Sequence, residues 1–248
     1  MHAFKDFFAV PGVFEVKNFA WFGLEHDVWL AAIIVLGLIV VYFYRMMPLE
    51  KRKSFLRIFA TCIVLSEVAR QLIYGIQGAY KLEYMPLHLC AVTELACLIY
   101  AYKRDAVSRE FMYWLGLPGA LSALLFPDWL HIPLWNFQSI HSFGVHGAMA
   151  IFAVLLLAGG ESRPKLKGAV WTLGLMAIFA PILYFLNKVW DTNFFFLNYP
   201  SPGSPLTILS DIAGNPGYIA LLILLVMVIW VFMFLPWAIS YRMKKAGD

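Results

Sequence analysis

Long apolar runs are the feature that most constrains this sequence. Polar residues are gathered into short clusters, and the runs between them are roughly 18 to 24 residues long, enough for a helix to cross about 30 Å of hydrocarbon. With 62% hydrophobic and only 14% charged residues, the chain has too little polar surface to cover a water-soluble domain. Residues 31–42 also lack the alternation typical of a membrane β-barrel strand. The sequence therefore predicts an all-α, polytopic membrane helix bundle.

Seven apolar runs are long enough to be transmembrane helices. We expect them at residues 29–46, 55–75, 84–102, 111–126, 137–157, 168–187 and 217–239. The predicted organisation is an N-terminal interfacial segment at 1–27, a seven-helix transmembrane domain at 28–241 and a tail at 242–248. The first segment has no basic start followed by an apolar core and a small-residue cleavage site, so no cleavable signal peptide is expected.

The basic residues predict the orientation of the bundle. Most of the 19 lie in the tail and in every second connection, whereas the remaining connections carry only Lys81 and Lys188. Because cytoplasmic loops are enriched in Lys and Arg, we expect the N-terminus outside and the C-terminus in the cytoplasm. These clusters are better explained by topology and contact with anionic lipids than by binding of nucleic acid. Their members are Arg45, Lys51, Arg52, Lys53 and Arg57; Lys103, Arg104 and Arg109; Arg163, Lys165 and Lys167; and Arg242, Lys244 and Lys245.

The longest predicted connection, the outer loop 188–216, is rich in proline and glycine. Loops of this length often form a lid or carry function, and an irregular connector is the alternative. The three cysteines, Cys62, Cys90 and Cys97, all lie inside apolar runs. Neither a disulfide framework nor a zinc site built from cysteine pairs is therefore predicted.

Polar residues inside the predicted spans gather at one depth. At about 1.5 Å of rise per residue, they lie between the outer surface and the midplane on the second, third and fifth spans. Ionisable groups in hydrocarbon are usually functional or paired inside the bundle, so this layer is the candidate site. Its members are Glu67, Arg70 and Gln71; His88, Cys90 and Glu94; and His141 and His146.

Helical spacing separates the possible roles of these residues. Glu67 is three residues from Arg70, so the two share a face and can neutralise one another, which favours a packing role. His141 and His146 are five residues apart and do not form the pair of a helical metal site, and no metal is predicted. A neutral His146 deep in an apolar helix needs a hydrogen-bond partner. It is the candidate general base, with Cys90 or water as the attacking group.

Several motifs resemble those of a known family. Met85-Pro86-Leu87-His88-Leu89-Cys90 is the most specific, and the shorter ones are 124–128, 137–147 and 192–197. By these motifs the chain resembles the YwaF-like bacterial integral membrane proteins from about the second to the seventh span. That family is similar to the eukaryotic transmembrane-protein-164 family, described as lipid acyltransferases that use an intramembrane cysteine and histidine.

The resemblance implies roles for individual residues. His88 and His146 match family histidines, and Asn193 matches an asparagine of the outer loop. The cysteine of the eukaryotic motif falls on Leu87, whereas the bacterial cysteine is Cys90, so the nucleophile is not transferred directly. A bacterial inner or plasma membrane is the implied location, with membrane lipids as partners.

Three functions remain open from the sequence. The first is an acyltransferase or hydrolase of acyl lipids, with His146, His88 and Cys90 as catalytic residues and no cofactor. Glu94, Glu67, Arg70, His141 and Asn193 would then support them. The second is a transporter or permease component whose polar layer lines a path, although the inner half has few matching groups. The third is a membrane scaffold in which the same layer only fixes helix packing. The substrate and the oligomeric state are not indicated.

Overall fold

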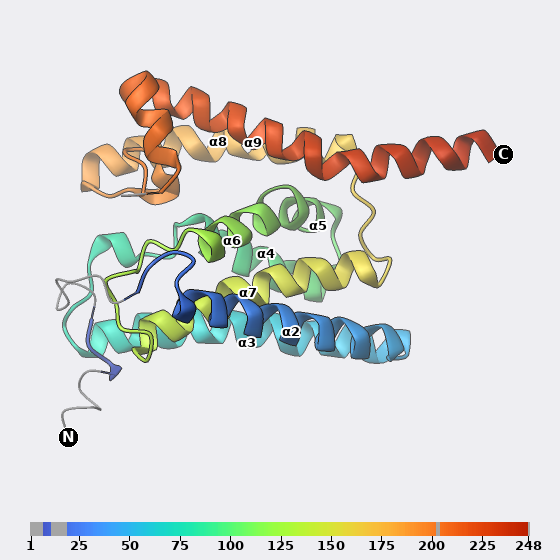
Figure 1. Ribbon diagram of the computed structural model, residues 1–248, viewed down its shortest axis with the longest axis horizontal. Coiled ribbons are helices and arrows are strands. Elements are labelled where there is room, and N and C mark those ends of the chain that lie inside the picture. The colour runs from blue at the N-terminus through green and yellow to red at the C-terminus, as the bar shows by residue number, and fades with distance from the viewer. Residues whose placement is uncertain (1–6, 11–18, 202–203, 248) are drawn as a thin grey trace.

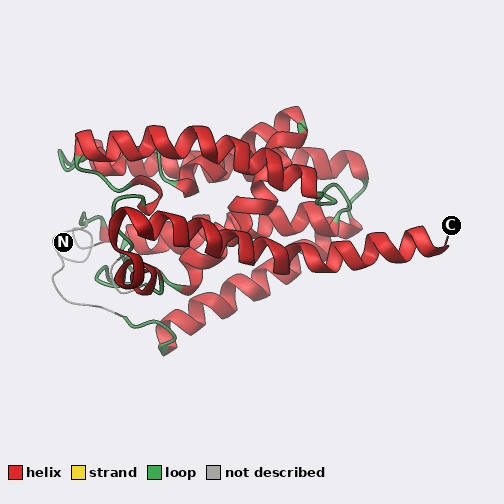
Figure 2. Cartoon of the chain, turned by 90° about the horizontal axis from the view of Figure 1, so that it is seen from above, coloured by secondary structure: helices red, strands yellow, loops and turns green. Residues whose placement is uncertain are grey.

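The computed structural model describes residues 7–10, 19–201 and 204–247, and side chains up to Met243. Nearly all of this part is helical (Figures 1 and 2). The long helices are α2 (Leu24–Met46), α3 (Leu49–Ile76), α4 (Leu89–Lys103), α7 (Phe137–Ala158), α8 (Leu166–Trp190) and α9 (Leu206–Gly247). Shorter pieces are the 3-10 helices η1 (Leu82–Tyr84) and η3 (Phe194–Phe196), and the run α5 (Ala106–Phe111), η2 (Met112–Gly116) and α6 (Leu117–Leu125).

A helix lies at each of the seven predicted spans, and five helical segments in the described part are long and apolar enough to cross a membrane. They are Leu24–Met46, Leu82–Lys103, Phe137–Ala158, Leu166–Trp190 and Leu206–Met243. The other two predicted spans coincide with α3 and with the run 106–125. The first carries a basic cluster near its start and the second is divided by the π-helix η2. The all-helical membrane fold is thus confirmed, whereas the count of seven spans and the orientation of the termini stay predictions.

The helices form two layers (Figure 1). In the larger layer α7 packs against α2, α3, α4 and α6, and it has the largest buried share of the five candidate spans. In the second layer α8 contacts α5 and η2, and Trp230 on α9 donates a hydrogen bond to the carbonyl of Trp114 in η2. The largest core cluster surrounds η2, where Met112 and Trp114 are each only 1% exposed. Bulky side chains of η2 thus fill the space between the layers.

The three predicted basic connections and the start of the tail lie at one end of the molecule (Figure 1), which we call the basic end. Glu161, after α7, binds Arg104 after α4 and Tyr44 at the end of α2. Tyr241 on α9 donates a hydrogen bond to the carbonyl of Pro164 over 3.0 Å. The alternation of charge along the sequence therefore corresponds to a real grouping in space.

Two predicted segments have different bounds in the structure. Within 188–216, α8 continues to Trp190 and α9 begins at Leu206, so 191–205 joins the two helices. The α9 backbone leaves helical geometry at Gly214 and Asn215, just before the predicted span begins. The predicted N-terminal segment 1–27 lies partly outside the described residues, and α2 begins within it at Leu24. Propensity alone did not place these helix ends, because packing extends helices beyond their most apolar stretch.

Candidate functional site

Glu67, Arg70 and Gln71 form the ion-paired cluster that their spacing predicts. Arg70 donates two hydrogen bonds to the Glu67 carboxylate, over 2.8 Å from Nε and 2.6 Å from Nη2. The Gln71 amide donates to the same carboxylate over 2.5 Å and to the carbonyl of Tyr84 over 2.6 Å. The two charges neutralise one another, and the cluster ties α3 to the segment before α4.

The same layer joins α3 to α7. The His141 Nε2 lies 3.8 Å from a Glu67 oxygen, beyond hydrogen-bond distance. The Tyr74 hydroxyl donates to the side-chain carbonyl of Gln138, and the Gln138 amide donates to Ser142 Oγ over 3.2 Å. These contacts favour a packing role for Glu67, Arg70 and His141.

His146 is held in one orientation and one tautomer. Its Nδ1 lies 2.7 Å from the carbonyl oxygen of Ser142, and a carbonyl only accepts, so Nδ1 carries the proton of the neutral ring. The ring stacks on Trp129, with centroids 5.7 Å apart and planes 18° apart. His146 is half-buried as a whole residue, its Nε2 keeps the lone pair, and no hydrogen bond reaches that atom from the described part of the chain. That nitrogen can accept a proton from a bound molecule.

His88 stands at the start of α4 rather than inside it. Its backbone is extended, with φ −71° and ψ 157°, and the helix begins at Leu89. Helical spacing therefore does not fix how the His88 side chain is turned relative to Cys90. The ring places Nε2 3.1 Å from the carbonyl of Glu83, and its centroid is 5.0 Å from that of Phe194.

Cys90 and Glu94 follow on the first turns of α4. Cys90 is half-buried, and within the described residues no hydrogen bond joins it to either His88 or His146. Glu94 is only 3% exposed, and we find no hydrogen bond or ion pair to it in the described part. A buried carboxyl without a partner is costly, so Glu94 is an unexplained polar group of this layer.

Coulomb interactions link the polar groups of the three helices. The charge of Arg70 acts on His88, Cys90, Glu94, His141 and His146. The exposed carboxylate of Asp128, which follows α6, acts on both His88 and His146. We did not select Asp128 from the sequence. Its only signal was its place after Pro127 in one of the family-like motifs.

Asn193 has a role in its own loop. Its amide donates to the carbonyl of Tyr199 over 2.8 Å, and its side-chain oxygen accepts from the amides of Asn198 and Tyr199. The following residue, Phe194, is fully buried beside His88. The loop therefore uses Asn193 to hold its shape and Phe194 to cover the start of α4. Among the described residues no group of three or more His, Cys, Asp and Glu could hold a metal ion.

Comparison with known proteins places this layer within a family. A model of the TMEM164 family matches residues 21–234. The chain belongs to the TMEM164 family. No curated protein and no solved structure matched the chain. The TMEM164 match includes every predicted site residue, and it supports the resemblance by which Asn193 was selected and His88 and His146 were matched to family histidines.

Proposed function

We propose that this TMEM164-family protein is an intramembrane enzyme that transfers or hydrolyses the acyl ester of a lipid. The proposal includes seven transmembrane spans, an outer N-terminus and a cytoplasmic C-terminus, so that the polar layer lies in the outer half of the bilayer. The observation that carries the proposal is the fixed His146 ring, whose Nδ1 donates to the backbone carbonyl of Ser142 while Nε2 keeps a free lone pair. A base in a defined tautomer is what acyl chemistry needs.

In this proposal His146 Nε2 accepts the proton of an attacking hydroxyl group, from water or from a second lipid. The hydroxyl oxygen bonds to the acyl carbonyl carbon and forms a tetrahedral intermediate. The bond from that carbon to the ester oxygen then breaks, and the imidazolium returns its proton to the departing alkoxide. Attack by water gives a free fatty acid, and attack by a lipid hydroxyl gives a new ester.

We propose a hydroxyl rather than the Cys90 thiol as the attacking group. A thiol attacks as its thiolate and needs a neighbouring base. No hydrogen bond joins Cys90 to a histidine in the described part. His88, which lies in the same layer, is proposed to orient the substrate. The ion-paired Glu67 and Arg70 are proposed to hold the helices in register.

Mass-spectrometric lipid profiling tests the proposal. The purified protein is incubated with a phospholipid and a lysophospholipid, and new acylated or deacylated species are quantified. Loss of a general base typically costs about 100-fold or more, so His146→Gln is expected to lower turnover by at least that factor. His131→Gln, in the connection between α6 and α7, is the matched control and should keep full turnover. Unchanged product in His146→Gln, or no product from wild type, would contradict the proposal.

Two cysteine variants test the attacking group. Cys90→Ser is expected to keep most of the turnover if a hydroxyl attacks. Cys62→Ser, at an exposed position on α3, controls for loss of any thiol. Loss of turnover in Cys90→Ser alone would establish the thiol route instead. A His146→Gln protein that melts much earlier than wild type would favour the scaffold function.

A further inference from the structure

A polar hollow lies at the basic end, between the end of α7 and the last turns of α9. Its volume is about 340 Å³, within the range of about 300–1,000 Å³ that small-molecule sites occupy. It is lined by the turn after α7 and by one face of α9, with Gly159, Gly160, Ser162, Arg163, Trp237 and Tyr241 among its walls. This hollow is separate from the polar layer around His146.

The two glycines shape the turn that lines the hollow. A Cβ on Gly159 would lie 2.8 Å from the ring of Tyr44, so a side chain there would collide with a buried residue. Gly160 has φ of +75°, a conformation that residues with a side chain rarely adopt. The turn therefore requires glycine at both positions.

Ser162 gives the hollow an unused hydrogen-bonding group. The residue is 2% exposed, and its buried Oγ has no hydrogen-bond partner in the described part of the chain. Leaving a buried hydroxyl unpaired costs free energy, whereas a bound acceptor would satisfy it. An oxygen-rich ligand would supply that acceptor.

The charge around the hollow selects an anion. Arg163 lines it and is exposed, and its charge acts on Tyr241. The two nearby carboxylates are engaged elsewhere, since Glu161 binds Arg104 and Glu110 accepts from Arg109 over 3.4 Å. The guanidinium of Arg163 is thus available to a ligand.

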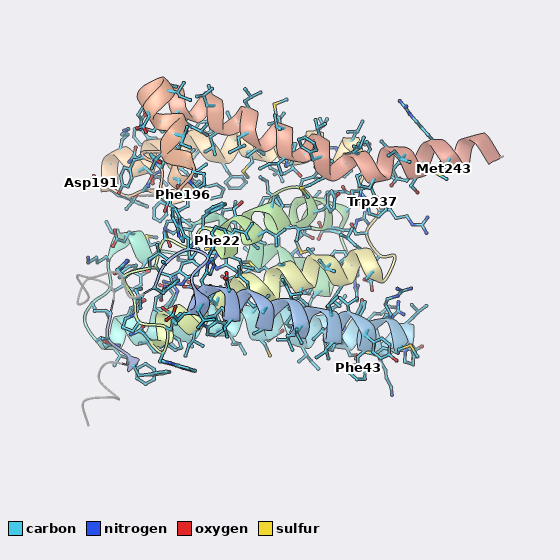
Figure 3. The ribbon with its side chains drawn as sticks, viewed as in Figure 1. Phe22, Phe43, Asp191, Phe196, Trp237 and Met243 are labelled. Atoms are coloured by element: carbon cyan, nitrogen blue, oxygen red, sulfur yellow. The ribbon has the colours of Figure 1, made fainter. Side chains whose placement is uncertain are left out.

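The aromatic wall suits a headgroup at the membrane surface. Trp237 faces the bundle (Figure 3) and donates to the Tyr113 hydroxyl over 3.0 Å, while Tyr241 donates to the carbonyl of Pro164. Their polar atoms are therefore occupied, and their rings present flat apolar surface. Tryptophan and tyrosine gather at the interface between hydrocarbon and headgroups.

We propose that this hollow binds the phosphate group of an anionic glycerophospholipid in the leaflet at the basic end. The Arg163 guanidinium pairs with the phosphate oxygens, the Ser162 hydroxyl donates to one of them, and the glycerol lies against Trp237 and Tyr241. Guanidinium matches phosphate geometry better than ammonium does. The lipid would be a bound partner, distinct from any substrate at His146.

Binding of short-chain phosphatidylglycerol to the purified protein tests this site, with glycerol phosphate and inorganic phosphate as separate probes. Loss of a hydrogen bond to a charged group corresponds to about tenfold or more in affinity, so Arg163→Gln and Ser162→Ala should each weaken binding by that factor. Lys167→Gln is the matched control, because Lys167 is a nearby cation in the first turn of α8 that lies over Trp171, and it should bind as wild type does.

The outcomes separate the possibilities. Selective loss in Arg163→Gln and Ser162→Ala supports the site. Equal loss in Lys167→Gln, or undiminished binding in both test variants, overturns it. If inorganic phosphate binds as tightly as the lipid, the ligand is free phosphate and the lipid assignment is wrong. Lipid turnover by wild type and His146→Gln does not enter this readout, so failure here leaves the proposed function untouched.

Discussion

His26 shows how one buried side chain can join distant parts of the chain. The residue has no exposed surface, its Nδ1 accepts from the amide of Phe22 over 2.9 Å, and its Nε2 lies 2.7 Å from the carbonyl of Leu124. The ring must therefore carry its proton on Nε2. It fixes the start of α2 against the end of α6.

Replacing His26 with leucine is expected to destabilise the protein strongly. The change leaves a buried amide and a buried carbonyl without partners, each costing roughly 1 to 3 kcal/mol. The unfolding midpoint in detergent measures the effect, and lipid turnover per folded molecule should stay normal. A melting curve equal to that of wild type would show that the two hydrogen bonds contribute nothing.

The sequence predicts the polar layer better than its individual contacts. Spacing on one helix gives the pairing of Glu67 with Arg70, because both partners are on the same face. Helical spacing does not predict the hydrogen bond between His26 and Leu124, which are 98 residues apart. It also does not predict the electrostatic interaction of Asp128 with His146. Such contacts depend on the tertiary arrangement, which no local pattern encodes.

At the level of elements, α5 begins with a complete cap. Asp105 accepts from the backbone amide of Ser108 over 2.8 Å and also from its hydroxyl. Partial burial raises the pKa of Asp105, but these hydrogen bonds outweigh it and hold the pKa below its ordinary value of 3.8. The cap therefore stabilises the helix at pH values above about 3.8 and loses this effect as the pH falls through the lowered pKa.

Removing this cap should have a modest, pH-dependent cost. Asp105→Ala is expected to lower the free energy of unfolding by about 1 kcal/mol at neutral pH. The difference from wild type should shrink in acid, as measured by unfolding at several pH values. Asp105→Asn keeps a capping oxygen without the charge and should lose much less. An equal loss in both variants would show that the charge, rather than the cap, matters.

The start of α8 packs closely against the carboxylate of Glu110. The buried Glu110 carboxylate accepts from Trp114 Nε1 over 3.2 Å and lies at the backbone of Lys165. A Cβ on Gly168 would lie 2.0 Å from a Glu110 oxygen. Only glycine leaves room for this contact between α5 and α8.

Gly168→Ala should therefore destabilise the protein, although alanine favours helices. Overpacking typically costs about 1 to 3 kcal/mol, more than the propensity gain of roughly 1 kcal/mol. Thermal unfolding is the measurement, and Gly174→Ala is the control because its Cβ would meet nothing within 4 Å. If Gly168→Ala is as stable as Gly174→Ala, Glu110 can move aside.

At the scale of the whole molecule, aromatic side chains connect the two layers. The Tyr113 hydroxyl donates to the carbonyl of Met233 over 2.7 Å and accepts from Trp237, and Trp230 donates to the carbonyl of Trp114 over 2.5 Å. All these contacts join η2 to α9. The attachment of α9 thus includes a few polar atoms within an apolar interface.

Tyr113→Phe should loosen this attachment. Two hydrogen bonds are lost at about 1 kcal/mol each, so the unfolding midpoint should fall and protease cleavage in residues 159–165 should accelerate. Tyr102→Phe, which removes an exposed hydroxyl, is the control. Cleavage at the wild-type rate would mean that apolar packing alone holds α9.

The sequence predicts some helices more accurately than others. The apolar runs of α2, α7 and α8 predict those helices directly, since no charged residue divides them. The predicted span 111–126 reads as a single helix, yet it contains the π-helix η2. Hydropathy cannot reveal such a bulge, because it depends on which faces the neighbouring helices require.

That π-helix has a consequence for how relatives should be compared. Each residue of an α-helix turns the chain by about 100°, so one surplus residue shifts the register of everything that follows. Before η2, Glu110 faces α8; at its end, Gly116 faces Thr93, whose methyl would lie 2.7 Å from any added Cβ. A relative shorter by one residue in this stretch can preserve one of these two contacts but must give up the other.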